Sequence, residues 1–204
     1  TIKNKHSVRK VFAANKIDNV TQYYEVGSLD DIKAIIDRIV YPVIVKPCDG
    51  SGSKSIKRVD SKYDFIEACT KAINSSLIRK ALVEDFIVGH EYGVEIFVYK
   101  GSIYVIGLMK KLMTNPPYYA ELGHMMPSGL MIEDLIKSVV QRAIKVLDVN
   151  FGSINMDILV SKDNKICIVD VGARMGGNLI GSHIIPYATG YDYLGNLIKA
   201  TVND

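Results

Sequence analysis

Two pairs of neighbouring apolar segments, each joined by a short turn, constrain the fold of this chain most. Residues 92–100 and 102–111 alternate between apolar and polar side chains on either side of a Lys-Gly pair. Residues 152–171 form a second such unit, which turns near residues 163–164. Short turns join antiparallel strands, whereas parallel strands need a crossover of about a dozen residues. The two hairpins therefore favour an α+β fold over a doubly wound parallel sheet.

The segments outside these hairpins alternate between helical and extended patterns. Helices are expected at 5–15, 28–41, 61–75 and 132–147, and strands at 22–27, 43–46, 56–59 and 81–86. Ser28 begins the second helix with Asp31 in a capping-box arrangement, and Pro42 ends it. One face of this helix is apolar: Leu29, Ile32, Ile35, Ile36 and Ile39.

The third helix and two less regular segments complete the predicted order of elements. Ser61 is expected to cap a helix that ends near Ser75, with an inward face of Phe65, Ile66, Cys69 and Ile73. Residues 112–131 contain three prolines and are expected to form a loop. A glycine-rich turn at 172–178 leads into two short helices.

Composition excludes several functional classes. The 204 residues carry a net charge of +3 with no basic run, which argues against a nucleic-acid-binding protein. No apolar run approaches the ~20 residues of a membrane helix, and the polar start is unlike a signal peptide. The three cysteines show neither metal-binding nor disulfide spacing, so we expect a reducing compartment, the cytoplasm. The first residue is Thr1 rather than Met, from which we expect a piece of a longer protein.

Lys46 is the first candidate functional residue, because it closes the apolar strand 43–46 and precedes the small-residue loop 48–55. Small residues allow backbone N–H groups to approach an anion, and a lysine supplies positive charge. The loop matches neither the Walker A pattern nor G-x-G-x-x-G, and a plain connecting loop is the alternative. A lysine at the end of an apolar strand is costly without a partner, which favours a phosphate site.

Asp157 and Asp170 form the second candidate site. Asp157 lies six residues before Asp163, and Asp170 lies six residues after Asn164. A two-residue turn at 163–164 would place the two carboxylates opposite each other, where like charges destabilise a sheet. A divalent cation would offset this repulsion, since Mg²⁺ takes one or two carboxylates plus substrate phosphates. A three-residue turn would shift the register by one, and a solvated strand end is a further alternative.

Arg174 lies in the glycine-rich turn at 172–178 and is the third candidate. A fixed guanidinium beside a metal-bound phosphate stabilises the charge that moves during phosphoryl transfer. The alternative is a surface arginine, but the surrounding glycines favour a tight backbone. Glu84 and Glu91, on either side of an apolar pair at 86–87, give a weaker signal.

Taken together, these motifs resemble the ATP-grasp superfamily over nearly the whole chain. The matching stretches are 41–56, 82–98, 116–128, 151–160, 168–178 and 188–193. Residues 121–128 read E-x-G-H-x-x-P-S, which is similar to the carbamoyl-phosphate-synthetase-like and amino-acid-ligase-like branches. Glu121 and His124 of this segment lie where the substrate loops of the family usually are.

The resemblance implies the ATP-grasp fold, in which two α+β subdomains with largely antiparallel sheets hold ATP between them. Residues 1–20 would lead into the larger subdomain, 21–86 would form the smaller one and 87–204 the larger. The implied activity transfers the γ-phosphate of ATP to a small-molecule carboxylate, and an amine or thiol then displaces phosphate from the acyl phosphate. Mg²⁺ or Mn²⁺ would be needed. A missing N-terminal domain would help to form the substrate site, and homodimer formation is left open.

The resemblance also implies roles for individual residues. Lys5 and Lys46 match the phosphate contacts of the family, and the flap over the phosphates would contain Gly50, Ser51, Gly52 and Ser53. The adenine base would be held by Glu84, Phe86 and Ile87, with Ile44 and Leu159 as its apolar walls. Glu91 would bind the ribose. Lys111, or its neighbour Lys110, would reach the γ-phosphate. Asp157 and Asp170 would carry the metal, and Arg174 would contact the acyl-phosphate region.

Two departures from the family pattern keep other functions open. The flap has Lys54-Ser55 where many relatives have Arg-Gly, and the usual Glu-x-Asn-x-Arg motif reads Asp170-x-Gly172-x-Arg174. Gly172 has no side chain to donate, so one metal ligand is missing, or Asn155, water or substrate supplies it. The alternative function is a catalytically degenerate or regulatory nucleotide-binding module. An interaction domain without nucleotide ranks last, because it must explain each charged residue separately.

Overall fold

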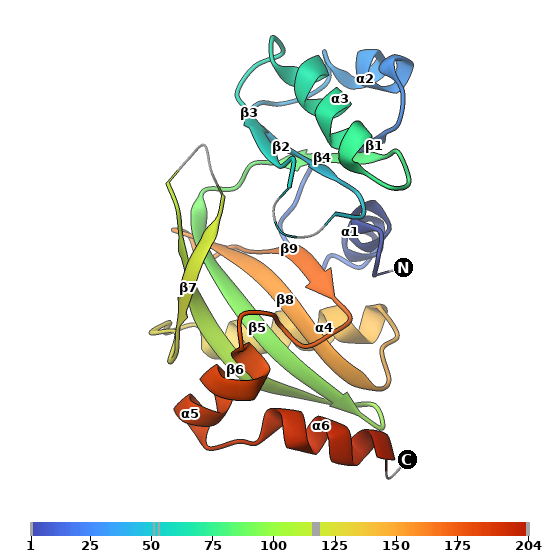
Figure 1. Ribbon diagram of the computed structural model, residues 1–204. Helices are drawn as coiled ribbons and strands as arrows, with labels where there is room; N and C mark the ends of the chain where they lie inside the picture. The colour runs from blue at the N-terminus through green and yellow to red at the C-terminus, as the bar shows by residue number, and fades with distance from the viewer. Residues whose placement is uncertain (1, 51, 53, 116–118, 203–204) are drawn as a thin grey trace.

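The computed structural model describes residues 2–50, 52, 54–115 and 119–202, which form two antiparallel sheets, one above the other in Figure 1. The smaller sheet has the strand order β1-β4-β2-β3, and the larger sheet has the order β7-β6-β5-β8-β9. Neighbouring strands within the described ranges are antiparallel throughout, which confirms the predicted α+β fold class.

The strands and helices follow the predicted order closely. The strands are β1 (Tyr23–Val26), β2 (Val43–Pro47), β3 (Lys57–Val59), β4 (Ala81–Asp85), β5 (Gly89–Tyr99), β6 (Ser102–Met113), β7 (Glu121–Met125), β8 (Gly152–Ser161) and β9 (Ile166–Gly172). The helices are α1 (Lys5–Ala14), α2 (Leu29–Ile35), α3 (Phe65–Ser75), α4 (Glu133–Val146), the π-helical turn η1 (Ile180–Ile184), α5 (Ile185–Thr189) and α6 (Tyr193–Val202). Not one of these helices has the length and apolar character to cross a membrane.

The smaller sheet has one apolar face and one polar face. Successive residues of a strand point to opposite faces, and cross-strand partners share a face. Val45 lies opposite Val83, and this face packs under α2 and α3 in a core that includes Val26, Val43, Val59, Phe65, Ala68 and Cys69. One residue along, Ile44 lies opposite Glu84 on the other face. That polar face is turned toward the larger sheet (Figure 1).

Helices pack on both faces of the larger sheet. α1 and α4 pack against the first face in a core that includes Phe12, Val94, Ile96, Ile136, Val140, Met156 and Ile158. On the second face, η1, α5 and α6 cover the end near the β5–β6 turn through Phe97, Met109, Ile180, Ile185 and Tyr193. The rest of the second face is turned toward the smaller sheet (Figure 1).

Two helices differ from the sequence prediction at their ends. α2 ends at Ile35, well before Pro42, because the N–H of Arg38 bonds back to the Ile35 carbonyl (2.8 Å) and tightens the last turn. α3 begins at Phe65 rather than at Ser61, and no side chain caps it. Its inward face therefore runs through Phe65, Ala68, Cys69 and Ala72, and the prediction that Ile66 points inward is wrong (40% exposed).

The segment 112–131 is more regular than predicted. β6 continues to Met113, and residues Glu121–Met125 form the edge strand β7, in which His124 lies opposite Lys111. Residues 121–125 read Glu-Leu-Gly-His-Met and do not alternate with period two, so the sequence carries no clear signal for this strand. Pro116 and Pro117 themselves lie outside the described residues.

The β8–β9 hairpin places Asp157 opposite Asp170, as predicted, but by a different route. The hydrogen bond that closes the turn leaves three residues in it, 162–164, rather than two. The strand pairs nearer the turn are one residue out of step with the Asp157–Asp170 pair, which leaves Val169 as an extra residue on β9. This β-bulge restores the register that the longer turn shifted.

The capping box at the start of α2 gives a direct test of the sequence reasoning. Ser28 Oγ accepts the N–H of Asp31 (3.1 Å), and the Asp31 carboxylate accepts the N–H of Ser28 (3.0 Å). We expect Ser28→Ala to lower the free energy of unfolding by about 1 kcal/mol, the usual effect of losing an N-cap. Urea denaturation measures it. Ser61→Ala is the control and should change it by less than about 0.5 kcal/mol; equal losses would contradict the assignment of the caps.

Candidate functional site

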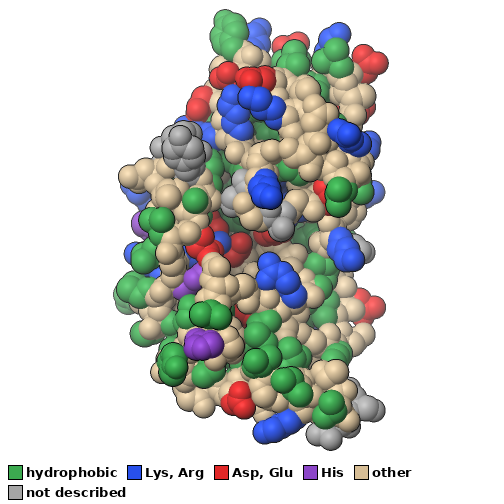
Figure 2. All heavy atoms as spheres, viewed as in Figure 1, with side chains coloured by type: hydrophobic (Ala, Val, Ile, Leu, Met, Phe, Trp, Pro, Cys, Tyr) green, Lys and Arg blue, Asp and Glu red, His purple; other side chains and the backbone are tan. Residues whose placement is uncertain are grey.

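The facing surfaces of the two sheets gather most of the predicted site residues. Lys46 and Glu84 project from the smaller sheet. On the second face of the larger sheet, register places together a set of polar residues: Glu91, Glu95, Lys111, Asn155, Asp157 and Asp170. Figure 2 shows a hollow between the upper and lower parts of the molecule, in which acidic side chains gather.

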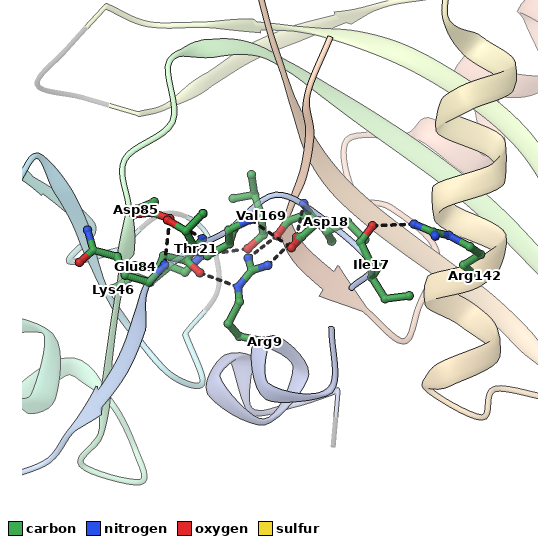
Figure 3. Close-up of polar contacts among 12 residues, drawn as sticks. Arg9, Ile17, Asp18, Thr21, Lys46, Glu84, Asp85, Arg142 and Val169 are labelled. Atoms are coloured by element: carbon green, nitrogen blue, oxygen red, sulfur yellow. Dashed lines mark hydrogen bonds and ion pairs between the residues drawn. The ribbon is translucent and has the colours of Figure 1, made fainter. Parts of the chain in front are cut away.

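A buried ion-pair network joins the smaller sheet to α1 and β9 (Figure 3). Lys46 Nζ forms an ion pair with Glu84 and donates to the Val169 carbonyl (2.9 Å). Arg9 Nε donates to the other oxygen of Glu84 (2.8 Å), and Arg9 Nη1 binds Asp18 (2.5 Å). Side chains of Lys46, Glu84, Arg9 and Asp18 are all at most 5% exposed. These charges are therefore paired within the fold rather than in water.

The two cations determine the charge of Glu84. Burial alone would raise the pKa of this carboxyl group, but Lys46 and Arg9 outweigh burial and hold the pKa below its usual value. Glu84 is thus ionised at neutral pH. Lys46 has three N–H bonds, and Glu84 and Val169 use two of them, so one remains for a further acceptor.

Lys5 and Asp170 form a second contact between α1 and the larger sheet. Lys5 Nζ lies 2.5 Å from Asp170 Oδ1, and the backbone N–H of Lys5 donates to the Cys48 carbonyl (2.7 Å). The first turn of α1 therefore lies between the start of the 48–55 loop and Asp170. The two predicted phosphate-binding lysines, Lys5 and Lys46, contact adjacent residues of β9, Asp170 and Val169.

Lys111 lies at the centre of an acidic cluster on the larger sheet. Its Nζ is 2.6 Å from Glu91, 3.0 Å from Asp157 and 3.1 Å from Glu121. Burial lowers the pKa of this ammonium group, but Asp157 and Glu91 outweigh burial and raise it, so Lys111 is charged. Lys110 pairs with Tyr92 on the opposite face of the sheet. Of the two lysines between which the sequence could not decide, Lys111 is therefore the one that faces the site.

Opposing electrostatic effects act on the pKa of the Asp157 carboxyl group. Burial raises its pKa to about 6, and the Lys111 ammonium works against this while Glu91 and Asp170 add to it. His124, beyond Lys111 on β7, is 3.5 Å from Glu121, and burial holds the pKa of its ring below the usual value. The cluster thus holds more acids than Lys111 can neutralise alone.

Glu95 is a site residue that the sequence reasoning missed. It is wholly buried and accepts hydrogen bonds from Asn155 Nδ2 (2.6 Å) and from the backbone N–H of Gly176 (3.0 Å). A Cβ at position 176 would lie 2.2 Å from Glu95 Oε1, so only glycine allows the 172–178 turn to come this close. Period-two spacing from Glu91 through Gly93 to Glu95 was the available signal.

Arg174 and Gly172 lie next to this anchor. Arg174 is exposed and donates to the Met175 carbonyl (2.8 Å), and its charge acts on Glu95. A Cβ on Gly172 would meet nothing closer than Arg174 Cγ at 3.7 Å. A Cβ at position 172 would therefore make only ordinary van der Waals contacts, and crowding at the backbone does not require glycine there.

The remaining predicted contacts have unequal support in the structure. Ile44 and Leu159 are half-buried, one on each sheet. The backbone N–H of Phe86 donates to the Pro42 carbonyl (3.2 Å). Because proline has no backbone N–H, Pro42 does not donate to the Phe86 carbonyl. The structure adds no described polar contact for Ile87, and Gly50 and Gly52 lie within the 48–55 loop. Ser51 and Ser53 lie outside the described residues.

Asp157 and Asp170 supply the oxygen ligands that a divalent cation prefers. They lie opposite each other on adjacent strands and share the face toward the smaller sheet. Within the described ranges, no three His, Cys, Asp or Glu side chains are grouped to hold a metal by themselves. The residues present therefore fit a Mg²⁺ or Mn²⁺ ion whose other ligands come from a phosphate group and water, and not a metal held by protein alone.

The buried pair of Lys46 and Glu84 predicts a large effect on stability. We expect Lys46→Met to lower the free energy of unfolding by about 3 kcal/mol, because breaking a buried pair leaves a charge with less compensation. Chemical denaturation measures this loss. Lys71→Met, which removes an exposed pair with Glu67, is the matched control and should change it by less than about 1 kcal/mol. Losses of similar size in the two variants would contradict the network.

Glu95 predicts a particular pH dependence. Burial raises its pKa to about 7 from a usual value of 4.5, so between these pH values the folded protein binds more protons than the unfolded chain. The free energy of unfolding must then fall as pH rises from 4.5 to 7, and Glu95→Gln removes this term. The stability of wild type minus that of Glu95→Gln should fall by on the order of 3 kcal/mol across the window. Denaturation at several pH values measures it, and a constant difference would contradict the assignment.

Comparisons of this chain with protein families, with individual proteins and with solved structures point to the same family. The ATP-grasp domain family matches residues 39–182. The chain is 28% identical to a carbamoyl-phosphate synthase of Methanobrevibacter smithii, over 80% of this chain and 44% of that protein. It is 30% identical to a D-alanine–D-alanine ligase of Thermosipho africanus, over 67% of this chain and 39% of that protein.

A solved structure extends the match to almost the whole chain. The crystal structure of an L-amino acid ligase from Bacillus licheniformis superposes with a TM-score of 0.83 at 25% identity, covering 97% of this chain and 47% of that one. The chain thus spans less than half the length of these relatives. The two facing sheets and the match over most of the sequence agree, and the chain belongs to the ATP-grasp domain family.

Proposed function

We propose that this chain is the ATP- and Mg²⁺-binding domain of an ATP-dependent ligase that joins a small-molecule carboxylate to an amine or a thiol through an acyl phosphate. One observation carries the proposal. Two buried lysines, Lys46 and Lys111, and two opposed carboxylates, Asp157 and Asp170, lie on the facing surfaces of the two sheets. A nucleoside triphosphate with its metal ion would pair with all four groups: its phosphates with the two lysines and its metal with the two carboxylates.

The lysines would bind and orient the phosphates. Lys46 keeps one N–H for a phosphate oxygen while Glu84 and Val169 hold its position. Lys5 and Lys111 each pair with a carboxylate that would coordinate the metal, so these lysines would turn from Asp170 and Asp157 toward phosphate oxygens. Catalysis of phosphoryl transfer consists mainly of such positioning and of electrostatic stabilisation.

The metal and Arg174 would act at the transferred group. Asp157 and Asp170 would hold Mg²⁺ or Mn²⁺, which would neutralise charge on the phosphate oxygens during transfer. Arg174 lies on the turn that Glu95 anchors, and its guanidinium would stabilise charge on the acyl-phosphate region. The carboxylate substrate would accept the γ-phosphate, and the incoming amine or thiol would then displace phosphate from the acyl carbon.

The other nucleotide contacts remain proposals on the same basis. We assign the flap to 50–55, the base to Glu84, Phe86 and Ile87 between Ile44 and Leu159, and the ribose to Glu91. Because the Glu84 carboxylate is engaged by two cations, its contribution to base binding would come chiefly from the backbone. The proposed subdomains are 21–86 and 87–204, with 1–20 leading into the larger one.

The parts of the protein that select the substrate, and its cellular compartment, are also proposed. Substrate selection would involve the 112–131 segment and parts of the polypeptide that correspond to the remaining length of the relatives. Cys48, Cys69 and Cys167 are buried free thiols, which supports a reducing compartment such as the cytoplasm.

A second candidate function, a degenerate or regulatory nucleotide-binding module, is favoured by Gly172. The space beside Gly172 is open, so the missing side chain is a chemical difference and not a consequence of crowding. The two functions differ in the products that the protein releases. A ligase would release ADP and phosphate when the full-length protein is given its carboxylate and amine, whereas a regulatory module would bind ATP without this release.

Calorimetric titration of ATP, with and without Mg²⁺, tests the proposed site. We expect wild type to bind Mg²⁺-ATP and Asp170→Asn to lose at least about tenfold in the Mg²⁺-dependent part of the affinity, since one metal ligand loses its charge. Asp163→Asn, the same substitution in the exposed turn of the same hairpin, is the control and should bind as wild type does. Equal affinity in Asp170→Asn and wild type would contradict the metal assignment.

A further inference from the structure

The bulge in β9 determines which residue lies opposite Asp157. With a three-residue turn and a regular ladder, Val169 would occupy that position, and Asp170 would point to the buried face of the sheet. The extra residue in the strand corrects the register and turns the Asp170 carboxylate to the face toward the smaller sheet. The proposed metal site therefore depends on one irregular peptide segment.

Charged side chains from outside the sheet hold the polar backbone groups of this bulge (Figure 3). Arg9 Nη2 donates to the Ile168 carbonyl (2.5 Å), and the Ile168 N–H donates to Asp18 Oδ2 (3.0 Å). Lys46 Nζ donates to the Val169 carbonyl (2.9 Å). A bulge disrupts the ladder locally, and buried backbone groups that lose their partners are costly. β9 is the edge strand of its sheet, so the N–H and C=O of Ile168 on the open side of the strand have no partner among the described strands. Asp18 and Arg9 bond these two groups, and Lys46 bonds the carbonyl of the bulged Val169.

Two apolar side chains of β9 can be buried in the same core only if the strand has the bulge, but their burial gives the backbone groups at the bulge no hydrogen-bond partners. Ile168 and Val171 both pack in the core of the larger sheet, although they are three positions apart and a regular strand would place them on opposite faces. An extra residue between them reconciles the two. Lys46 donates to the carbonyl of the bulged Val169, and one nitrogen of Arg9 holds the carbonyl of Ile168 just before it, while the other two nitrogens of Arg9 hold Asp18 and Glu84.

We propose that Arg9 and Asp18 are positioning residues of the site: by holding the β9 bulge they keep Asp170 opposite Asp157. Neither residue needs to contact the nucleotide. Their action passes through the backbone of Ile168 to the direction of the Asp170 side chain. This inference rests on the proposed function only where nucleotide binding is measured, because the strand register can be observed without any ligand.

Arg9→Lys is the variant that isolates this role. It keeps a cation beside Glu84 and Asp18, but one nitrogen cannot replace the three separate nitrogens with which Arg9 reaches Glu84, Asp18 and Ile168. Arg142→Lys is the matched control. Arg142 lies on α4 and donates through one nitrogen to the Ile17 carbonyl (2.9 Å), on the same connection as Asp18, without contact to the bulge.

Deletion of Val169 supplies the decisive rescue. In the shortened strand Asp170 follows Ile168 directly, so a regular ladder pairs Asp157 with Asp170 and puts Ile168 and Val171 on one face. The deletion removes the bulge, so the 157–170 pairing no longer depends on Arg9 to hold the strand just before it. If the proposal holds, the deletion should restore in the Arg9→Lys background what Arg9→Lys alone has lost.

Two readouts are made on each protein. Cross-strand backbone NOEs in NMR spectra report whether residue 157 lies opposite residue 170, and calorimetry reports the ratio of ATP affinities with and without Mg²⁺. We expect Arg9→Lys to lose the 157–170 NOEs and about tenfold of the Mg²⁺ effect, Arg142→Lys to retain both, and Arg9→Lys with Val169 deleted to regain both.

The remaining outcomes each decide a separate point. Unchanged 157–170 NOEs in Arg9→Lys would overturn the inference, as would a failure of the deletion to restore them. If Arg9→Lys does not fold, recovery of folding on deletion of Val169 supports the inference, and no recovery overturns it. If wild type shows no Mg²⁺-dependent binding, the proposed function fails, while the NOEs still decide whether Arg9 positions Asp170.

Discussion

The buried carboxylate of Glu84, held between Lys46 and Arg9, is the interaction on which the rest of the molecule depends. A lone carboxylate at this depth would be prohibitively costly, and each cation alone would be costly too. Together they allow a charged group to lie between two sheets that otherwise meet through polar faces. Because Lys46 and Arg9 also bind carbonyls of β9, the pair fixes the smaller sheet, α1 and the larger sheet relative to one another.

The candidate site is shared between these parts, and neither sheet contains it alone. The smaller sheet contributes Lys46 and the 48–55 loop, α1 contributes Lys5, and the larger sheet contributes the acids around Lys111. Each of the three lysines, Lys5, Lys46 and Lys111, already has an acidic partner within the fold. A ligand with several negative charges and a metal would exchange these partners rather than create charge pairs from isolated groups, which lowers the reorganisation that binding requires.

Much of the fold could be predicted from the sequence because the strands alternate strongly and the turns are short. Lys46 and the Asp157–Asp170 pair were predictable for the same reason: an ionisable residue inside an apolar strand needs an explanation. The register of the acids was predicted correctly from a turn that is one residue too short, because the bulge at Val169 compensated for the error. Arg9, Asp18 and Glu95 were not predictable as site residues, since their partners are backbone groups or residues far away in sequence.

The three-residue turn of the β8–β9 hairpin also has a consequence for comparing this chain with its relatives. Turn length and bulge compensate for each other, so a relative with a shorter strand and no bulge presents the same two carboxylates from a chain that is one residue shorter. An alignment through β9 must then open a gap at Val169, and the identity of the residue at position 9 should covary with that gap. Insertions in this hairpin are thus linked to substitutions in a helix about 160 residues away.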